Sequence, residues 1–114
     1  MTLNAQLQKA APVFAALGDE TRLHLVVRLA GGQPLPVARL AEGTGITRQA
    51  VAKHLRVLEL AQLARSSRRG REQIWELDRR RLDAARRCLD RIGSQWEQAL
   101  DRLRRAVEED GGSA

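Results

Sequence analysis

The stretch ITRQAVAKHLRVL, residues 46–58, decides the fold that this sequence predicts. Its apolar residues recur at the spacing of one helical face, and Thr47 suits an N-cap, whose side chain accepts a hydrogen bond from the first turn. These features predict a short helix that continues to about Leu60. The other face of this helix carries basic and amide side chains, which require an explanation in so small a protein.

A second short helix precedes this one and is joined to it by a tight turn. Pro36 suits the first turn of a helix that extends through Glu42, and the sequence GTG at residues 43–45 turns the chain. Two short helices joined by a turn that contains glycine form the helix-turn-helix plan. The residues expected to face the core in this plan are Leu40, Ala41, Ile46, Val51, Leu55 and Leu58.

The polar face of the second of these helices predicts contact with double-stranded DNA. A recognition helix enters the major groove with its N-terminus first, so its early side chains meet base edges. Arg48 can form a bidentate pair with guanine and Gln49 with adenine, each pair worth about 1–3 kcal/mol of discrimination. The residues better placed for phosphates are Thr47, Lys53 and Arg56.

The sequence after the recognition helix predicts a basic β-hairpin. In ARSSRRGREQIWELD, residues 64–78, Gly70 lies amid charged residues and suits a hairpin tip. Such a wing lies along the DNA backbone or places arginine in a narrow minor groove. A charged run alone is more typical of a solvated surface, but its position after a helix-turn-helix favours DNA contact. The arginines gathered around the tip are Arg65, Arg68, Arg69 and Arg71.

The segments before the helix-turn-helix predict two further helices and a loop. Helical spacing favours a helix over residues 4–17, which Pro12 can split or kink, and Asp19 suits the N-cap of a second helix over residues 20–30. Residues 31–36 form the clearest loop. The residues that the second helix is expected to bury are Leu23, Val26, Val27 and Ala30.

The last segment predicts a long helix over residues 79–109 with an apolar stripe that one small domain cannot cover. Its spacing resembles a heptad seam, so pairing with the same helix of a second copy is the simplest remedy, and packing within one chain is the alternative. We expect a homodimer interface formed by Leu3, Leu7, Phe14, Leu82, Ala85, Leu89, Ile92, Trp96, Leu100 and Leu103, with Val107 continuing the stripe.

These elements together predict a mainly α protein with a small β-hairpin, a winged helix-turn-helix. The expected order is four helices, the hairpin and the long helix. Residues 1–110 would form a single DNA-binding domain with N- and C-terminal dimerisation helices, and residues 111–114 a disordered tail.

Composition narrows the class of protein. The 114 residues carry a formal charge of +6, which favours a polyanionic partner, either nucleic acid or a membrane surface. The sequence shows no signal peptide and no membrane span. Its single cysteine, Cys88, cannot form an internal disulfide and fits a reducing cytoplasm. Because no paired carboxylates, nucleophile–histidine set or nucleotide-binding loop stands in a recognisable context, we expect a cytoplasmic protein that is not an enzyme.

Three segments carry a family resemblance: LGDETRLHLVVRLA, ITRQAVAKHLRVLELAQL and RRGREQIWELD resemble the ArsR/SmtB family of bacterial winged-helix repressors. The resemblance implies a homodimer that binds an inverted repeat at a promoter and blocks transcription, with an effector that lowers DNA affinity. It implies a packing or phosphate-contact role for His54. Two residues depart from the family pattern: Glu20 stands where proline is common, and Gln62 stands where glycine is common, so a different turn into the wing is expected.

The residues present argue against the metal sites for which that family is known. The stretch that matches its Cys-x-Cys pattern, residues 35–41, contains no cysteine, histidine or aspartate, and the last helix has no histidine. We therefore expect no metal and no cofactor. We expect His24 to be packed and hydrogen-bonded, and Cys88 to be a small hydrophobe or, alternatively, a redox switch. Two other functions stay open: a thiol redox-sensing repressor, and a basic winged-helix module that binds RNA or an acidic protein.

Overall fold

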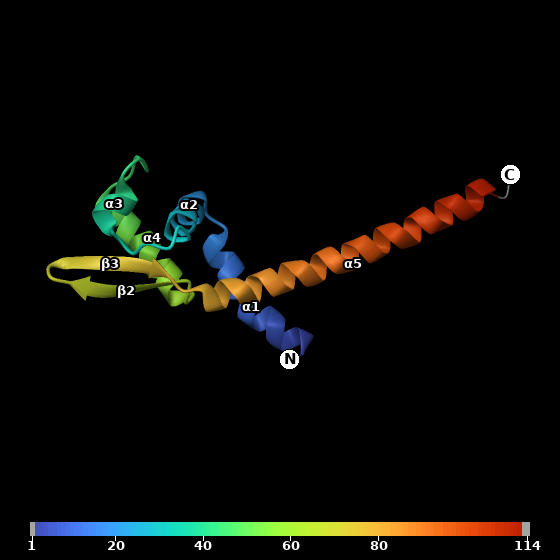
Figure 1. Cartoon of the computed structure of the whole chain (residues 1–114), viewed down its shortest axis with the longest axis horizontal. Helices are drawn as coiled ribbons and strands as arrows, with labels where there is room; N and C mark the ends of the chain where they lie inside the picture. Colours follow the sequence, from blue (N-terminus) through green and yellow to red (C-terminus); the bar gives the residue numbers. More distant parts are fainter. Residues whose placement is uncertain (1, 113–114) are drawn as a thin grey trace.

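The computed structural model describes residues 2–112 as a winged helix-turn-helix from which one long helix projects (Figure 1). The predicted fold class is confirmed. The order of elements is α1 (Leu3–Leu17), α2 (Glu20–Leu29), β1 (Leu35–Pro36), α3 (Val37–Ala41), α4 (Arg48–Leu60), β2 (Ala64–Arg69), β3 (Glu72–Leu77) and α5 (Arg79–Gly112). α1 runs through Pro12 as one helix.

The core lies where α1, α2 and α4 meet the sheet and the first turns of α5. Its aliphatic members come from every helix, and Trp75 of β3 is its largest side chain. The buried stripe predicted for α2 was wrong in phase, because apolar residues stand on both sides of this helix and the 3.6-residue period fits more than one face. Leu23, Val27 and Ala30 are exposed, and the residues that α2 buries are Leu25, Val26 and Leu29.

The hairpin predicted from the sequence is present and carries a third strand. β3 is central, with β2 and the two-residue β1 antiparallel on either side. Leu35 pairs with Trp75 and Pro36 with Ile74, so the segment expected to be a loop ends in an edge strand. Proline suits an edge strand, where its missing N–H breaks no ladder. β1 holds helix α3, which follows it directly, against the wing.

Asp78 fixes the start of α5. Its side chain accepts a hydrogen bond from the backbone N–H of Arg80 and forms an ion pair with the guanidinium of the same residue at 2.9 Å. The Arg80 side chain, followed by its backbone N–H, holds the pKa of Asp78 at about 2, below its ordinary value of 3.8. The ionised carboxylate therefore caps the helix at neutral pH.

Asp78→Asn should flatten the acid dependence of stability. Because the folded pKa is depressed, the stabilising contribution of Asp78 is present above about pH 4 and is lost as the pH falls to about 2. In urea denaturation at pH 5 and pH 2.5, the drop in the free energy of unfolding should be smaller in the variant than in the wild type. Equal drops in the two proteins would remove the Asp78–Arg80 pair from this account.

α5 leaves the body of the molecule after about three turns. Its first turns pack against α1, where Cys88 is buried, and from Leu89 to Asp110 no described residue is buried. The helix continues to Gly112, so it includes the first two residues of the predicted tail, and residues 113–114 lie outside the described part. None of the helices that the structure describes has the length and apolar character needed to cross a membrane.

Candidate nucleic-acid interface

The turn between α3 and α4 is built from glycine and threonine. Gly43 and Gly45 have φ angles of +77° and +75°, which favour glycine. Between them, the Thr44 hydroxyl donates to the carbonyl of Ala41 at 2.7 Å and accepts from the N–H of Ile46 at 3.3 Å. The turn therefore satisfies its own polar groups and sets the angle between the two helices.

Arg28 of α2 also holds this turn, a role that the sequence pattern did not indicate. Its guanidinium donates to the carbonyls of Leu40 and Glu42, at 3.0 and 3.2 Å. Carbonyls at the end of a helix lack partners within the helix. Arg28 therefore closes α3 from a neighbouring helix. No periodicity signals such a contact, since it depends on how α2 lies across α3.

The polar face predicted for α4 is exposed over its whole extent. Thr47 caps the helix by accepting from the N–H of Ala50 at 3.1 Å. At about 100° per residue, Arg48, Gln49, Lys53 and Arg56 fall within an arc of about 140°, and all four are exposed. The residues buried on the opposite side of α4 are Val51, Leu55 and Leu58.

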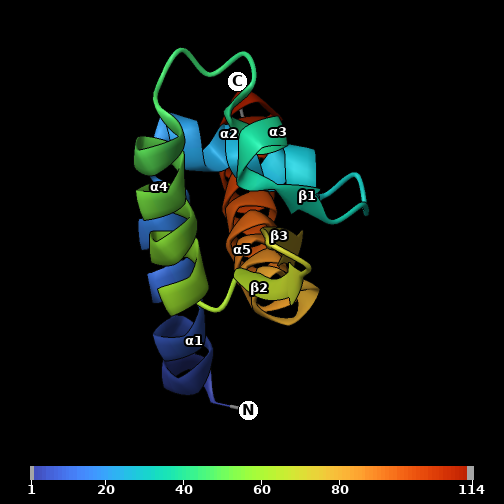
Figure 2. The same ribbon diagram turned by 90° about the vertical axis from the view of Figure 1, so that its left-hand side faces the viewer.

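One residue of the predicted core set lies at the surface. Ile46 is exposed, whereas Leu40 is buried and Ala41 packs against the core as expected. Ile46 precedes the N-cap of α4, so it belongs to the turn and not to the buried face of the helix. Figure 2 shows the loop from α3 to α4 arching over this end of the molecule.

Of the two histidines, His54 takes one of the two roles expected of it and His24 does not take its expected place. His54 lies within α4 but turns toward α2, where its Nδ1 is 3.3 Å from a guanidinium nitrogen of Arg22 and 3.9 Å from a carboxylate oxygen of Asp19. Arg22 in turn donates to the carbonyl of Ala16 at 2.6 Å. His54 thus helps to hold α4 against α2 and is not part of the exposed face, so only its packing role is retained.

Asp19 joins this cluster and caps α2. It accepts a hydrogen bond from the backbone N–H of Arg22 at 3.0 Å, and this bond, with the charge of Arg22, lowers the pKa of Asp19. His24, expected to be packed, has a side chain that is 74% exposed, with Glu20 as its neighbour at 3.9 Å. α2 buries the face that carries Leu25, Val26 and Leu29, and His24 lies outside that face and points to solvent.

The wing carries an exposed basic tip. Gly70, with a φ of +62°, turns the chain between β2 and β3. Arg68, Arg69 and Arg71 beside it are exposed. Arg65, expected in the same cluster, instead pairs with Glu76 across the hairpin at 2.9 Å and stiffens the base of the wing.

Gln62 joins the recognition helix to the wing with a left-handed backbone. Its φ is +62°, and the N–H groups of Gln62 and Leu63 donate to the carbonyls of Glu59 and Leu58, both at 2.9 Å. This is the Schellman ending of a helix, in which the left-handed position is usually glycine. The different turn geometry expected from glutamine was therefore wrong: Gln62 adopts the conformation of glycine and adds a bond from Arg81 Nε to its Oε1 at 2.6 Å.

Gln62→Gly should be more stable than Gln62→Ala by about 1 kcal/mol, because a side chain in the left-handed region carries a steric cost that glycine avoids. Both variants lose the same bond to Arg81, so their difference isolates the backbone. The measurement is the free energy of unfolding of each variant by urea denaturation. Equal stabilities would show that Gln62 carries no backbone strain.

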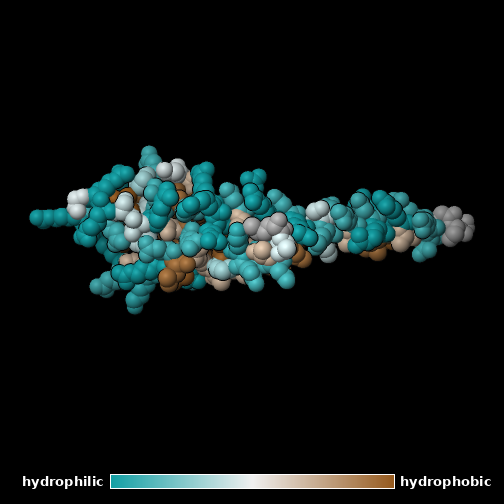
Figure 3. All heavy atoms as spheres, turned by 90° about the horizontal axis from the view of Figure 1, so that it is seen from below, coloured by the Kyte–Doolittle hydropathy of each residue, from teal (hydrophilic) through white to brown (hydrophobic). Residues whose placement is uncertain are grey.

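The residues predicted for a dimer interface divide into two groups. Ala85 is only 3% exposed and belongs to the chain's own core, with Phe14 and Leu82 packed against it, so Ala85 offers almost no surface to a second copy. In the face of the molecule that Figure 3 shows, apolar side chains lie along one edge of α5 and hydrophilic side chains cover the rest of it. The exposed members of the apolar stripe along α5 are Leu89, Ile92, Trp96, Leu103 and Val107, and Leu3 and Leu7 of α1 are exposed as well.

The described residues also bear on metal binding and on thiol chemistry. They contain no group of three or more histidine, cysteine, aspartate or glutamate side chains that could hold a metal ion. Cys88 is buried where α5 meets α1, away from the exposed face of α4. Burial restricts access of an oxidant to a thiol, so the arrangement favours its role as a small packing residue.

Comparison with known proteins identifies relatives of this chain. A helix-turn-helix domain family matches residues 17–66. The HTH-type transcriptional regulator Rv2034 of Mycobacterium tuberculosis is 38% identical over 98 residues, which cover 86% of this chain and 88% of that protein.

Solved structures agree with this match. An ArsR-like transcriptional regulator from Rhodococcus sp. RHA1 has a TM-score of 0.70 and 35% identity, over 87% of this chain and 92% of that one. The homodimeric winged helix-turn-helix DNA-binding domain of Mb0332 from Mycobacterium bovis has a TM-score of 0.60 and 23% identity, over 87% and 88% of the two chains, which is a likeness of fold.

Proposed function

Because this chain belongs to the ArsR-like family of winged helix-turn-helix transcriptional regulators, we propose that it acts as a homodimeric repressor on an inverted-repeat operator. The chain is a DNA-binding regulator and not an enzyme. The single observation that carries the finer proposal is the exposed arc of α4, where base-reading and phosphate-binding side chains share one face that the chain itself leaves uncovered.

The proposed contacts divide into base reading and backbone positioning. Arg48 and Gln49, in the first turn of α4, read base edges in the major groove. Thr47, Lys53 and Arg56 bind phosphates beside them, and contacts of this kind fix the register of the protein on the duplex. The three exposed arginines of the wing tip bind the neighbouring DNA backbone or minor groove. These are Arg68, Arg69 and Arg71.

Dimerisation is proposed through α5. The helix presents exposed apolar side chains over several turns beyond the domain, a surface that a lone small domain rarely leaves in water. A two-fold axis through paired α5 helices buries this stripe and repeats α4 on the other side, which suits two half-sites of an inverted repeat. Leu3 and Leu7 of α1 are proposed to join the same interface.

We further propose that the repressor works without a metal ion and that Cys88 serves packing. The redox alternative requires that an oxidant reach a buried thiol. The alternative of RNA or an acidic protein as partner does not explain why Arg48 and Gln49, which suit base pairs in the major groove, stand together in the first turn of α4. Among these, a DNA repressor accounts for α4, the wing and α5 together.

Selection of bound fragments from random duplex DNA tests the proposal. We expect a two-fold symmetric consensus that is unchanged by a chelator. Enrichment that disappears with a thiol oxidant would replace the packing role of Cys88 with a switch. An absence of any consensus, with firm binding to RNA instead, would overturn the operator proposal.

A further inference from the structure

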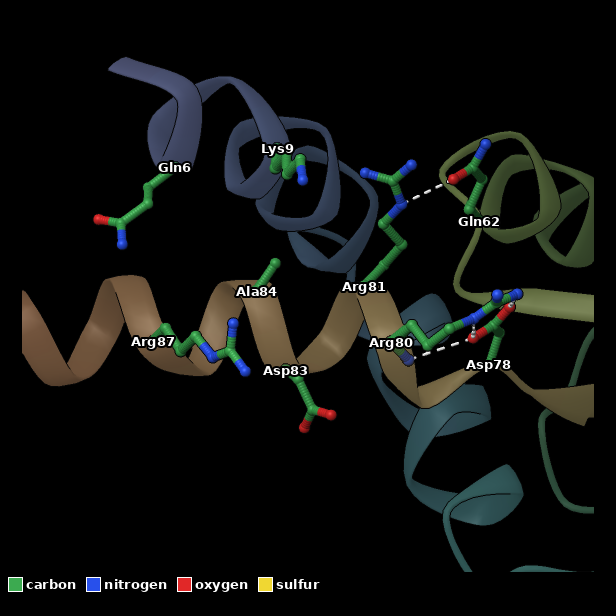
Figure 4. A pocket seen from close by; sticks show the side chains of 9 residues that line it. All are labelled: Gln6, Lys9, Gln62, Asp78, Arg80, Arg81, Asp83, Ala84 and Arg87. Atoms are coloured by element: carbon green, nitrogen blue, oxygen red, sulfur yellow. Dashed lines mark hydrogen bonds and ion pairs between the residues drawn. The ribbon is translucent and has the colours of Figure 1, made fainter. Parts of the chain in front are cut away.

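A cavity of about 480 Å³ lies between α1, the turn at Gln62 and the first turns of α5 (Figure 4). It is separate from the DNA-facing surface: the wing tip and the N-terminal end of α4 lie away from this side of the body (Figures 1 and 2). Its size is within the range of small-molecule sites. The residues that line it are Gln6, Lys9, Gln62, Asp78, Arg80, Arg81, Asp83, Ala84 and Arg87.

The lining is rich in cations that the chain does not neutralise. Arg80 is paired with Asp78 at 2.9 Å, whereas Lys9 and Arg87 have no ion pair among the described residues. The carboxylate of Asp83 points away from α1 in Figure 4. Lys9 and Arg87 are both exposed and bring positive charge to the lining of the cavity from two helices that are distant in sequence.

Further hydrogen-bond donors lie at the cavity. Gln6 accepts from Arg91 through its Oε1 at 3.2 Å, which leaves its amide nitrogen as a donor at the cavity. Arg81 uses its Nε for Gln62, so its two terminal nitrogens remain available as donors. Guanidinium groups present parallel donors that match the oxygens of carboxylates and phosphates.

We propose that this cavity binds a small oxyanion, a carboxylate or a phosphate, and that the bound anion weakens DNA binding. The second half rests on the function proposed above. The charge of the cavity, its donors and its volume support the class of ligand. The bond between Arg81 and Gln62 supplies the link to α4.

The link runs through a strained position. Gln62 has the left-handed backbone of the turn between α4 and the wing. Arg81 Nε donates a hydrogen bond to its Oε1 at 2.6 Å. An oxyanion bound to the terminal nitrogens of Arg81 draws the guanidinium toward the cavity and away from Gln62, because a guanidinium binds an anion more strongly than a neutral amide. Release of Gln62 then lets the wing change its angle to α4, and the two DNA-contacting elements no longer fit the duplex together.

Binding is tested first on the free protein, without DNA. Calorimetric titration with inorganic phosphate, and separately with succinate, is made at constant ionic strength set with sodium chloride. The variant is Lys9→Gln/Arg87→Gln, and its matched control is Arg102→Gln/Arg105→Gln, which removes the same charge from α5 outside the cavity. We expect saturable binding of at least one probe to the wild type and the control, and about tenfold weaker binding to the variant.

Two results would overturn the site. One is the absence of saturable binding by either probe, and the other is equal binding by variant and control. A preference for phosphate over succinate identifies the anionic group that the cavity binds as a phosphate, and the reverse preference identifies it as a carboxylate. Because this step uses no DNA, it stands even if the operator proposal fails.

Regulation is tested by measuring duplex affinity with and without the bound probe at one ionic strength. The wild type and Arg102→Gln/Arg105→Gln should bind the duplex several-fold more weakly when the probe saturates the cavity, and Lys9→Gln/Arg87→Gln should not respond. Probe binding with unchanged duplex affinity in the wild type would overturn the regulatory half. Loss of duplex binding under all conditions would contradict the proposed function instead.

Discussion

Arg48→Ala is expected to abolish most of the preference for the operator over scrambled DNA. A bidentate arginine–guanine pair contributes about 1–3 kcal/mol of discrimination, so the ratio of specific to nonspecific affinity should fall about tenfold or more for each half-site. Arg48 is exposed at the first position of α4 and has no ion pair among the described residues, so its removal should leave the fold intact. The measurement is fluorescence anisotropy with operator and scrambled duplexes at one salt concentration.

Arg69→Ala is the matched control for this variant, because it removes the same charge from the wing tip. It should weaken all duplexes to a similar extent and reduce the slope of log affinity against log salt by about one per chain. If Arg48→Ala weakens both duplexes equally, α4 does not enter the groove by its N-terminus, and the proposed orientation on DNA is wrong.

Leu89→Glu is expected to convert the dimer to a folded monomer. Leu89 is 55% exposed in the single chain, so a glutamate there stays hydrated in the monomer, whereas a paired α5 would bury its charge at high cost. Linked binding to two half-sites exceeds single-site affinity by about 10²–10⁴-fold, and the variant should lose affinity for the inverted repeat on that scale. Sedimentation equilibrium and duplex titration measure the two effects.

Leu23→Glu separates dimerisation from the general effect of a surface charge. Leu23 is 47% exposed on α2, close to the exposure of Leu89, but lies outside the apolar stripe of α5. This control should remain dimeric. A dimer that persists in Leu89→Glu would exclude the α5 stripe as the interface, and circular dichroism checks that both variants keep their helices.

The elements that local rules specify could be predicted from the sequence. Thr47 and Asp19 cap helices as their side chains indicate, and Gly70 turns the hairpin where a left-handed residue is required. Val51, Leu55 and Leu58 recur on one face of α4, and this spacing gave the correct solution for its buried face even though Val57 and Leu60 are exposed elsewhere on the helix. The exposed arc that carries the proposed DNA contacts follows from that solution.

The features that depend on neighbouring elements could not be predicted. α2 has apolar residues over more than one face, and only its packing against α1 and α4 decides that Leu25 is buried and Leu23 exposed. β1 is too short to show an alternating pattern. His54 turns toward Arg22, a residue 32 positions away, and nothing in the sequence around either residue signals that contact.

Gln62 shows how the wider fold overrides a local preference. A glutamine in this position predicts a different turn, since left-handed backbone disfavours side chains. The closure of α4 by Leu63 and the attachment of Arg81 impose the turn nonetheless. The bond between Arg81 and Gln62 also connects the basic cavity to the turn before the wing, and the sequence of α4 alone does not predict this connection.

We propose that two copies of the chain, paired through α5, read the two half-sites of an inverted-repeat operator. The most direct measurement is titration of the selected inverted repeat and of a single half-site duplex, with mass determined for each complex. We predict two chains on the inverted repeat and at least about 100-fold weaker binding to the half-site. One chain per duplex, with equal affinity for the two, would contradict the account.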